Sequence, residues 1–312
     1  MDFKDWVIAS LGLPQDIGSA IELNLQLAAE TVKALNGSSS RLDEETLTGA
    51  MIGALVAAHP MSAASFPSDQ ASAIQWSGYA KHGSGINSER SSGADFALVI
   101  SLPDGRLRLA IFQAKSDWSA SATKDTLVVG QVKEVPEEKD ADGIVIHDAY
   151  SRNQIEALVK TANGIELKNE KIISASNLSW VHYLCQFQLG IKAVALSQIE
   201  SHVLQSIESC KEVRLMLLPN KGVQLEQLLK SGCSEKADGW LDLPTLDDVG
   251  LPTAIDLSAL VELMPVVVAR EGAGGPQVEL VMGVEGTTLS RPLLDLQEPT
   301  PVPVPAKTFG MS

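Results

Sequence analysis

The sequence predicts an α/β fold in which a mixed central sheet is flanked by helices. The clearest observation is a β-hairpin: the apolar runs FALVISL and RLRLAIF flank Pro103-Asp104-Gly105, which has the composition of a tight turn. In LAIFQAK, residues 109–115, apolar residues fill both phases of the strand, which is typical of a strand covered on both faces. Segments with helical spacing of apolar residues occur before and after the hairpin, at 16–36, 42–58 and 151–163.

Elements before the hairpin are two helices and a short strand. Helix 16–36 is followed by Gly37 and three serines, and helix 42–58 begins after the capping residue Asp43 and should stop at His59-Pro60. A short strand is expected around residues 73–80. After the hairpin, the polar stretch 117–143 is expected to be irregular. The later elements are a strand at 144–150, helix 151–163, strands at 179–187 and 213–219, a strand or helix start at 191–199, and a helix at 222–232.

These elements divide the chain into four segments. Residues 1–40 form a helical N-terminal segment, and residues 41–233 contain the hairpin and the main α/β domain. Residues 234–297 form a C-terminal α/β extension with weaker periodicity. Residues 298–312 include four prolines between 299 and 305 and should be an extended tail.

Composition favours an ordinary soluble protein. The 312 residues are 45% hydrophobic and 20% charged, and no stretch approaches the roughly 20 consecutive apolar residues of a bilayer span. The first residues resemble no signal peptide, and the three cysteines lack the spacing of a disulfide or metal framework. We therefore expect a cytoplasmic protein with no membrane partner.

Charge is distributed unevenly along the chain. The net charge is −15, which by itself disfavours general binding of nucleic acid because phosphate contacts need Lys and Arg. Residues 71–133 nevertheless carry seven basic and five acidic residues, a balance of +2, whereas residues 234–312 carry four basic and twelve acidic ones, a balance of −8. The acidity lies mostly outside the hairpin region.

Polar residues gather where the two hairpin strands meet. Asp95 precedes the first strand, and Gln113 lies near the end of the second, so both are about equally far from the turn and should adjoin. Gln113 and Lys115 share one face of their strand because side chains alternate. Carboxylate and amide oxygens are ligands that Mg²⁺ prefers, and a nearby lysine can orient a water.

Helix 42–58 offers a further carboxylate. Glu44 aligns with Leu47, Met51 and Leu55, whereas Glu45 aligns with the less apolar stripe of Thr48, Ile52 and Val56. We prefer Glu44, because the more apolar stripe is expected to face the sheet. Both acids would also suit the helix dipole without any role at a site.

This arrangement resembles the PD-(D/E)XK nuclease superfamily, which has the restriction-endonuclease-like fold. The matching features are a helix bearing Glu44, then Gly93-Ala94-Asp95, then a hairpin ending in Gln113-Ala114-Lys115, as in the QxK variant of Mrr-like members. The resemblance covers about residues 40–200. It implies Mg²⁺ or Mn²⁺ held by Asp95, Gln113, the carbonyl of Ala114 and an acid from Glu44 or Glu45, with Lys115 as the catalytic lysine. Gly-Ala replaces the proline of the family motif, and Gln113 is neutral where most members have an acid.

The resemblance further implies hydrolysis of phosphodiester bonds, most simply of DNA, as an effector subunit of a bacterial antiphage defence system. Arg90, Arg152 and Gln154 are candidate substrate contacts, although each is also an ordinary residue of a loop or helix start. The excess negative charge predicts that a partner protein or a homo-oligomer delivers the nucleic acid. The rival hypothesis is a catalytically inactive, nuclease-like scaffold that binds a partner.

Overall fold

A computed structural model describes most of the chain up to residue 271. The described residues are 2–38, 42–67, 70, 72–76, 92–104, 106–116, 125–135, 137–139, 145–147, 149–166, 177–187, 190–218, 221–243, 260 and 263–271. Arg90, most of the predicted C-terminal extension and the proline-rich tail lie outside these residues.

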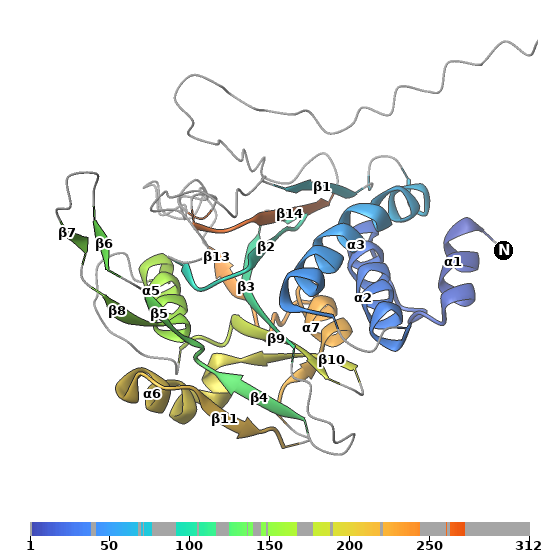
Figure 1. Cartoon of the computed structure of the whole chain (residues 1–312). Coiled ribbons are helices and arrows are strands. Elements are labelled where there is room, and N and C mark those ends of the chain that lie inside the picture. Colours follow the sequence, from blue (N-terminus) through green and yellow to red (C-terminus); the bar gives the residue numbers. More distant parts are fainter. Residues whose placement is uncertain are drawn as a thin grey trace, which may run out of the picture.

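The fold is built around an eight-stranded mixed sheet, which confirms the predicted α/β class with a mixed central sheet (Figure 1). Seven strands follow the order β1 (Ser72–Trp76), β14 (Val266–Glu271), β2 (Phe96–Ser101), β3 (Leu107–Ser116), β9 (Val181–Phe187), β10 (Gly190–Ala195) and β12 (Val223–Gln224), and β13 (Leu241–Leu243) pairs with β3. β14 runs parallel to β2 and β9 runs parallel to β3, whereas the other pairs are antiparallel. β13 and β14 come from the segment predicted as a C-terminal extension.

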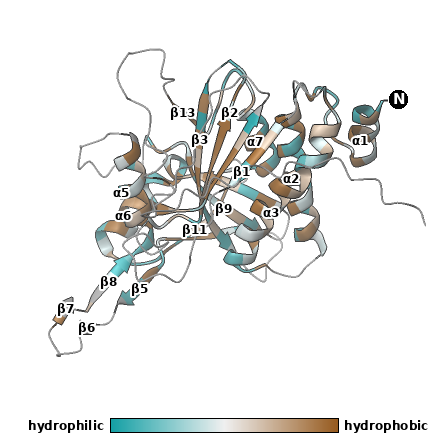
Figure 2. Ribbon diagram, turned by 90° about the horizontal axis from the view of Figure 1, so that it is seen from above, coloured by the Kyte–Doolittle hydropathy of each residue, from teal (hydrophilic) through white to brown (hydrophobic). Residues whose placement is uncertain are grey.

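Helices cover both faces of this sheet. On one face, α2 (Ala20–Ser38), α3 (Glu44–Ala64) and α7 (Leu225–Ser231) enclose a core with Phe96, Phe112 and Leu184. On the other face, α5 (Gln154–Glu166) and α6 (Glu200–Ser209) pack over Ile111 and Tyr183. Hydrophobic residues concentrate on the strands between these layers (Figure 2). The remaining elements are α1 (Phe3–Leu11), the 3-10 helix η2 (Leu196–Ile199), and three strand pairs: β4 (Thr126–Val129) with β11 (Val213–Met216), β5 (Val132–Val135) with β8 (Tyr150–Asn153), and β6 (Glu138–Lys139) with β7 (Val145–His147).

Two local expectations are wrong. Helix α3 does not stop at His59-Pro60 but continues to Ala64. Val56 and Pro60 are both exposed, so the helical hydrogen bond that proline cannot make is lost on the solvent side. The segment 117–143 is not irregular throughout, because it contains β4, β5 and β6. β4 pairs with the distant β11, and β5 and β6 pair with the short strands β8 and β7. The sequence around each strand therefore shows little of the pattern from which a strand can be predicted.

Helix α3 bears on the expectation that no stretch approaches the length of an apolar bilayer span. Within the described residues it is the one helix that is long and apolar enough to do so by length and composition. Leu47, Met51, Ala54 and Leu55 are buried, which agrees with the expectation that the helix face aligned with Glu44 packs on the sheet. A core helix passes the same composition test, so this feature does not decide where the protein resides.

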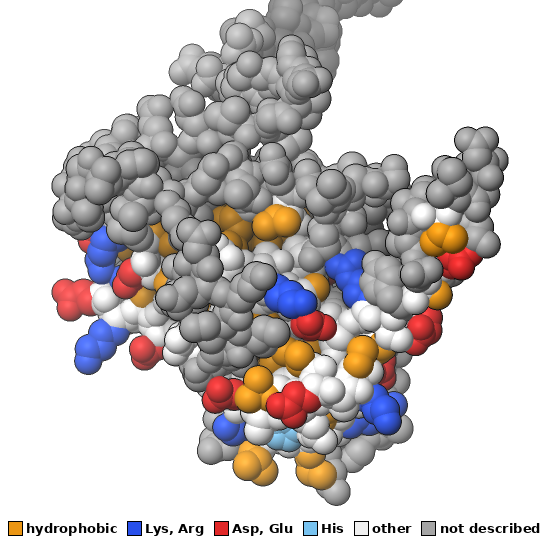
Figure 3. Space-filling model, turned by 90° about the vertical axis from the view of Figure 1, so that its left-hand side faces the viewer, with side chains coloured by type: hydrophobic (Ala, Val, Ile, Leu, Met, Phe, Trp, Pro, Cys, Tyr) orange, Lys and Arg blue, Asp and Glu red, His pale blue; other side chains and the backbone are white. Residues whose placement is uncertain are grey.

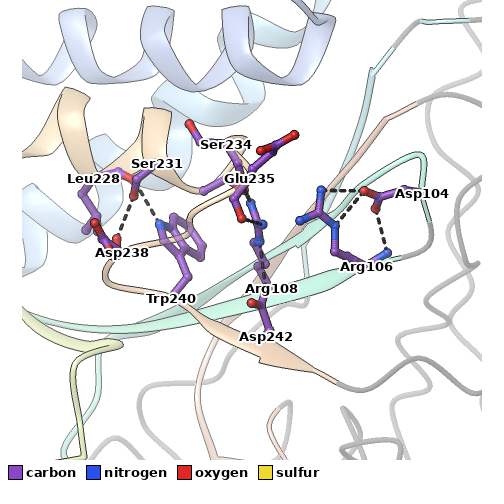
Figure 4. A network of polar contacts seen from close by, with 11 residues as sticks. Asp104, Arg106, Arg108, Leu228, Ser231, Ser234, Glu235, Asp238, Trp240 and Asp242 are labelled. Carbon is purple, nitrogen blue, oxygen red and sulfur yellow. Dashed lines mark hydrogen bonds and ion pairs between the residues drawn. The ribbon is translucent and has the colours of Figure 1, made fainter. Parts of the chain in front are cut away.

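The first half of β3 is fixed by a fully buried arginine. Arg108 donates hydrogen bonds to the carbonyls of Gly232 at 2.7 Å, Ser234 at 2.5 Å and Glu235 at 3.3 Å, and to Asp242 Oδ1 at 2.9 Å (Figure 4). These bonds compensate the loss of hydration and attach the end of α7 and strand β13 to the hairpin. Beside them, Asp104 accepts from Arg106 across the turn, and this contact lowers the pKa of Asp104.

A buried histidine lies against the same hairpin. The ring of His182 stacks on Phe112 with centroids 5.6 Å apart, and its Nε2 is 2.8 Å from the carbonyl of Gly239. Its Nδ1 has no partner among the described residues. Burial lowers the pKa of His182 from its usual value of about 6.5 to about 4, because the charged ring would lose its hydration.

We predict that this histidine makes the fold acid-sensitive. The unfolded chain binds a proton at His182 below about pH 6.5, whereas the folded chain does so only near pH 4. The full free energy of unfolding is therefore present above about pH 6.5, and it decreases as the pH falls from about 6.5 to about 4. Moving from pH 7 to pH 5 should cost about 2 kcal/mol through this residue. Urea unfolding at both pH values measures this cost. His182→Gln should show a smaller loss on acidification, and an unchanged loss would contradict the assignment.

Candidate functional site

Asp95 and Gln113 form a cross-strand pair at the open end of the hairpin. The Asp95 backbone N–H donates to the carbonyl of Phe112 at 2.9 Å, which extends the β2–β3 ladder by one residue and places Asp95 opposite Gln113. Asp95 Oδ2 accepts from Gln113 Nε2 at 2.7 Å and from the Ala114 N–H at 2.6 Å. Two short bonds to one carboxylate oxygen therefore fix this side chain and orient the Gln113 amide.

The oxygen donors at this pair suit a hard cation. Gln113 is buried, and its Oε1 has no hydrogen-bond partner within the described part of the chain. A buried acceptor without a partner is costly, and turning the amide over would place this oxygen against the Asp95 carboxylate. The described residues contain no group of three or more His, Cys, Asp or Glu suited to a metal. An ion here would therefore depend on one carboxylate together with amide, backbone and water oxygens, a mixed set that Mg²⁺ accepts.

Lys115 lies two residues beyond Gln113 on the same face of β3, and its side chain is 6% exposed. Its Nζ donates to Gln154 Oε1 at 2.9 Å and lies 3.3 Å from both carboxylate oxygens of Glu44. Gln154 begins α5 and Glu44 begins α3, so the ammonium joins helices that cover opposite faces of the sheet. A buried ammonium needs such partners because its hydration is lost.

Local structure fixes both helix starts. The Asp43 side chain caps α3 by accepting from the Thr46 N–H at 2.7 Å, so Glu44 occupies the first helical position. On the other side, Gly93 lies directly against the first turn of α5: an added Cβ would be 2.4 Å from the Gln154 carbonyl oxygen. Gly93 also has φ +69°, a conformation that side chains disfavour. The Gly-Ala sequence before Asp95 therefore permits close packing of α5.

Tyr183 lies on β9 next to the strand that carries Gln113 and Lys115. It is the parallel register partner of Gln113 on β9, and its hydroxyl oxygen accepts from the Gly130 N–H at 3.2 Å. Burial raises the pKa of Tyr183, so the phenol stays protonated. The Gln154 N–H in turn donates to the Gln131 carbonyl at 2.9 Å. The β4–β5 connection is thus tied to both β9 and the start of α5.

The structure brings together most of the site residues that the sequence predicts. Asp95, Gln113, Ala114, Lys115 and Glu44 lie around the end of β3. Glu45 is exposed on the next position of α3, and Lys115 contacts Glu44 in its place. Arg152 is half-buried on β8, opposite Lys133. Gln154 contacts Lys115, a role that no sequence pattern indicates because the two residues are far apart in the chain.

Comparisons of the chain with protein-family models, with curated proteins and with solved structures find no match.

The Glu44–Lys115 contact predicts unequal effects for two neighbouring acids. Glu44→Gln should destabilise the protein by about 1–2 kcal/mol, because the buried ammonium loses its charged partner while Glu44 itself is partly solvated. Glu45→Gln makes the same charge change in the same helical turn and should stay within about 0.5 kcal/mol. Chemical denaturation measures both variants. Equal effects would show that the helix dipole, and not the ion pair, is responsible.

The close approach at Gly93 gives a second stability prediction. Gly93→Ala should destabilise by about 2–4 kcal/mol, since the added methyl group meets the backbone of α5 and the backbone has positive φ. The matched control is Gly49→Ala in α3, where, apart from the helix's own backbone and the adjacent residues, no described atom lies within 4 Å of the added carbon. That change should stabilise by up to about 1 kcal/mol through helix propensity. Thermal denaturation compares them, and a neutral Gly93→Ala would contradict the packing.

Proposed function

We propose that the protein is a metal-dependent nuclease of the restriction-endonuclease-like type that hydrolyses phosphodiester bonds, most simply those of DNA. The observation that carries the proposal is the adjacency of two arrangements on one face of β3. One is the Asp95–Gln113 pair with its unpartnered buried oxygen, and the other is the buried ammonium of Lys115. The resemblance of the QxK hairpin to the PD-(D/E)XK superfamily supports the same chemistry.

Each residue has a distinct role in this proposal. Asp95, Gln113 Oε1 and the Ala114 carbonyl would hold Mg²⁺ or Mn²⁺, with Glu44 at the margin of the set. When bound, the ion supplies Lewis-acid chemistry toward a phosphate oxygen. Lys115 donates a hydrogen bond to the attacking water and orients it. Glu44 and Gln154 accept from the ammonium, so the lysine is already placed before substrate arrives.

Surface charge supports a role for a partner. The net charge is −15, and on the face seen from the side of α5 and α6, acidic and basic side chains are interspersed among the described residues (Figure 3). Such a surface attracts a polyanion weakly at physiological salt. We therefore propose that a partner protein, or an oligomer of this chain, delivers the nucleic acid, and that the protein is an effector subunit of an antiphage defence system.

The proposal predicts how three variants separate metal binding from cleavage. Asp95→Asn should lose both, and Lys115→Ala should keep Mg²⁺ binding while plasmid cleavage falls by about 100-fold or more, because the lysine acts on the water. Gln113→Glu should tighten Mg²⁺ binding by adding a charge to the ligand set. Calorimetric titration of Mg²⁺ and Mn²⁺ and a plasmid-cleavage assay on the same preparations test these expectations.

The matched control is Lys230→Ala, which removes a lysine that pairs with Asp16 at 2.8 Å on the α7 side. It should leave metal binding and cleavage unchanged. Cleavage by Asp95→Asn at the wild-type rate would contradict the assigned site. Wild-type protein that neither binds metal nor cuts DNA would favour the inactive scaffold, which the acidic net charge also favours.

A further inference from the structure

A buried glutamine outside the proposed catalytic set contacts three segments that surround it. Gln186 lies on β9, is 3% exposed, and is the register partner of Ser116, the last residue of β3. Its Oε1 accepts from the Leu42 N–H at 3.0 Å and from Ser116 Oγ at 3.2 Å. Its Nε2 donates to Asn36 Oδ1 at 2.6 Å. One amide thus joins the end of α2, the approach to α3 and the end of β3.

These contacts lie immediately beside the Glu44–Lys115 pair. Leu42 is two residues before Glu44, and Ser116 follows Lys115. Gln186 faces the α2–α3 side of the sheet with Leu184 and Ala114, whereas Gln113 lies on the opposite face. Glu44 must therefore meet Lys115 around the end of β3, and the Gln186 amide sets the separation between those two backbone segments.

An amide suits this position better than other side chains of its size. Two donors converge on its oxygen, and its nitrogen must donate at the same time, which neither a carboxylate nor an apolar side chain can do. Asn36 extends the connection by donating from Nδ2 to the Phe187 carbonyl at 3.2 Å. Because the group is buried, losing one partner leaves the others without compensation from water.

We infer that Gln186 is a positioning residue that holds Glu44 against Lys115. The inference rests on the proposed function for its catalytic consequence, although the contact itself can be tested without activity. Gln186 touches neither the proposed ion ligands nor the water. It acts by keeping the first turn of α3 at the end of β3, and thereby keeps the lysine ammonium in place.

The test compares Gln186→Met with Gln26→Met in the full-length protein. Gln26 is the matched control: it is 2% exposed and also donates from a buried amide, to the Glu226 carbonyl at 2.9 Å. Acylation of Lys115 by an amine-reactive reagent, followed by mass spectrometry, reports release of the ammonium. It should quicken by about tenfold in Gln186→Met and remain near the wild-type rate in Gln26→Met.

Plasmid cleavage with Mg²⁺ gives a second readout. In Gln186→Met, kcat should fall by about tenfold while KM for DNA stays unchanged, because the lysine is misplaced but the substrate surface is not. Gln186→Glu retains an acceptor for Leu42 and Ser116 but loses the donor to Asn36, so acylation and kcat should both lie between those of the wild type and those of Gln186→Met. Ser116→Ala removes one donor with little change in volume and should give a partial increase in acylation, which keeps the test available if Gln186→Met does not fold.

Equal acylation of Lys115 in Gln186→Met and Gln26→Met would overturn the positioning role, as would Gln186→Glu behaving like Gln186→Met. Failure of the proposed function looks different. Wild-type protein would then neither bind Mg²⁺ nor cut DNA, while the acylation rates would still separate the two methionine variants.

Discussion

Two positively charged side chains are buried near opposite ends of one strand. Much of the structure around that strand supplies the polar partners that compensate their lost hydration. Arg108 is fully buried in the first half of β3, and Lys115 is nearly so at its end. A charge taken out of water is tolerated only with good partners, so each cation draws distant segments onto β3. Arg108 attaches the end of α7 and strand β13, whereas Lys115 joins the starts of α3 and α5. The strand is thereby fixed in relation to both helical layers.

At the proposed site, the contacts that stabilise the fold also hold the side chains with proposed roles. Glu44 and Gln154 hold the ammonium of Lys115 on a rigid strand, while Asp95 and Gln113 are held by the hairpin ladder. Each side chain is supported by regular secondary structure, which favours the precise placement that chemistry requires. The unpartnered oxygen of Gln113 is the exception among these contacts. It is one of several buried polar atoms without a partner among the described residues, and among them it is the one that lies beside the Asp95 carboxylate, where the proposed ion would satisfy it.

Much of this arrangement could be predicted from local sequence, and the remainder could not. The hairpin followed from its turn and the two apolar runs that flank it, and the choice of Glu44 followed from a helical stripe, because both signals lie within about twenty residues. The contact of Gln154 with Lys115 and the bonds of Gln186 to Leu42 and Ser116 depend on how strands and helices meet in space. Helix α3 continues through Pro60 because the lost bond faces solvent, a fact that depends on burial and not on the proline itself. The metal, the substrate and the partner remain predictions.

The position of β14 has a consequence for how the chain acquires this structure. β14 lies beside β2 as a parallel partner, yet it follows β2 by about 170 residues in the sequence. Until it is synthesised, the apolar strand β2 has β3 on one side and lacks its other neighbour from this sheet. Pairing between such distant segments is slow, and an unpaired apolar edge can associate with other chains. The nascent protein should therefore depend on chaperones, or aggregate on release, whenever synthesis stops before β14.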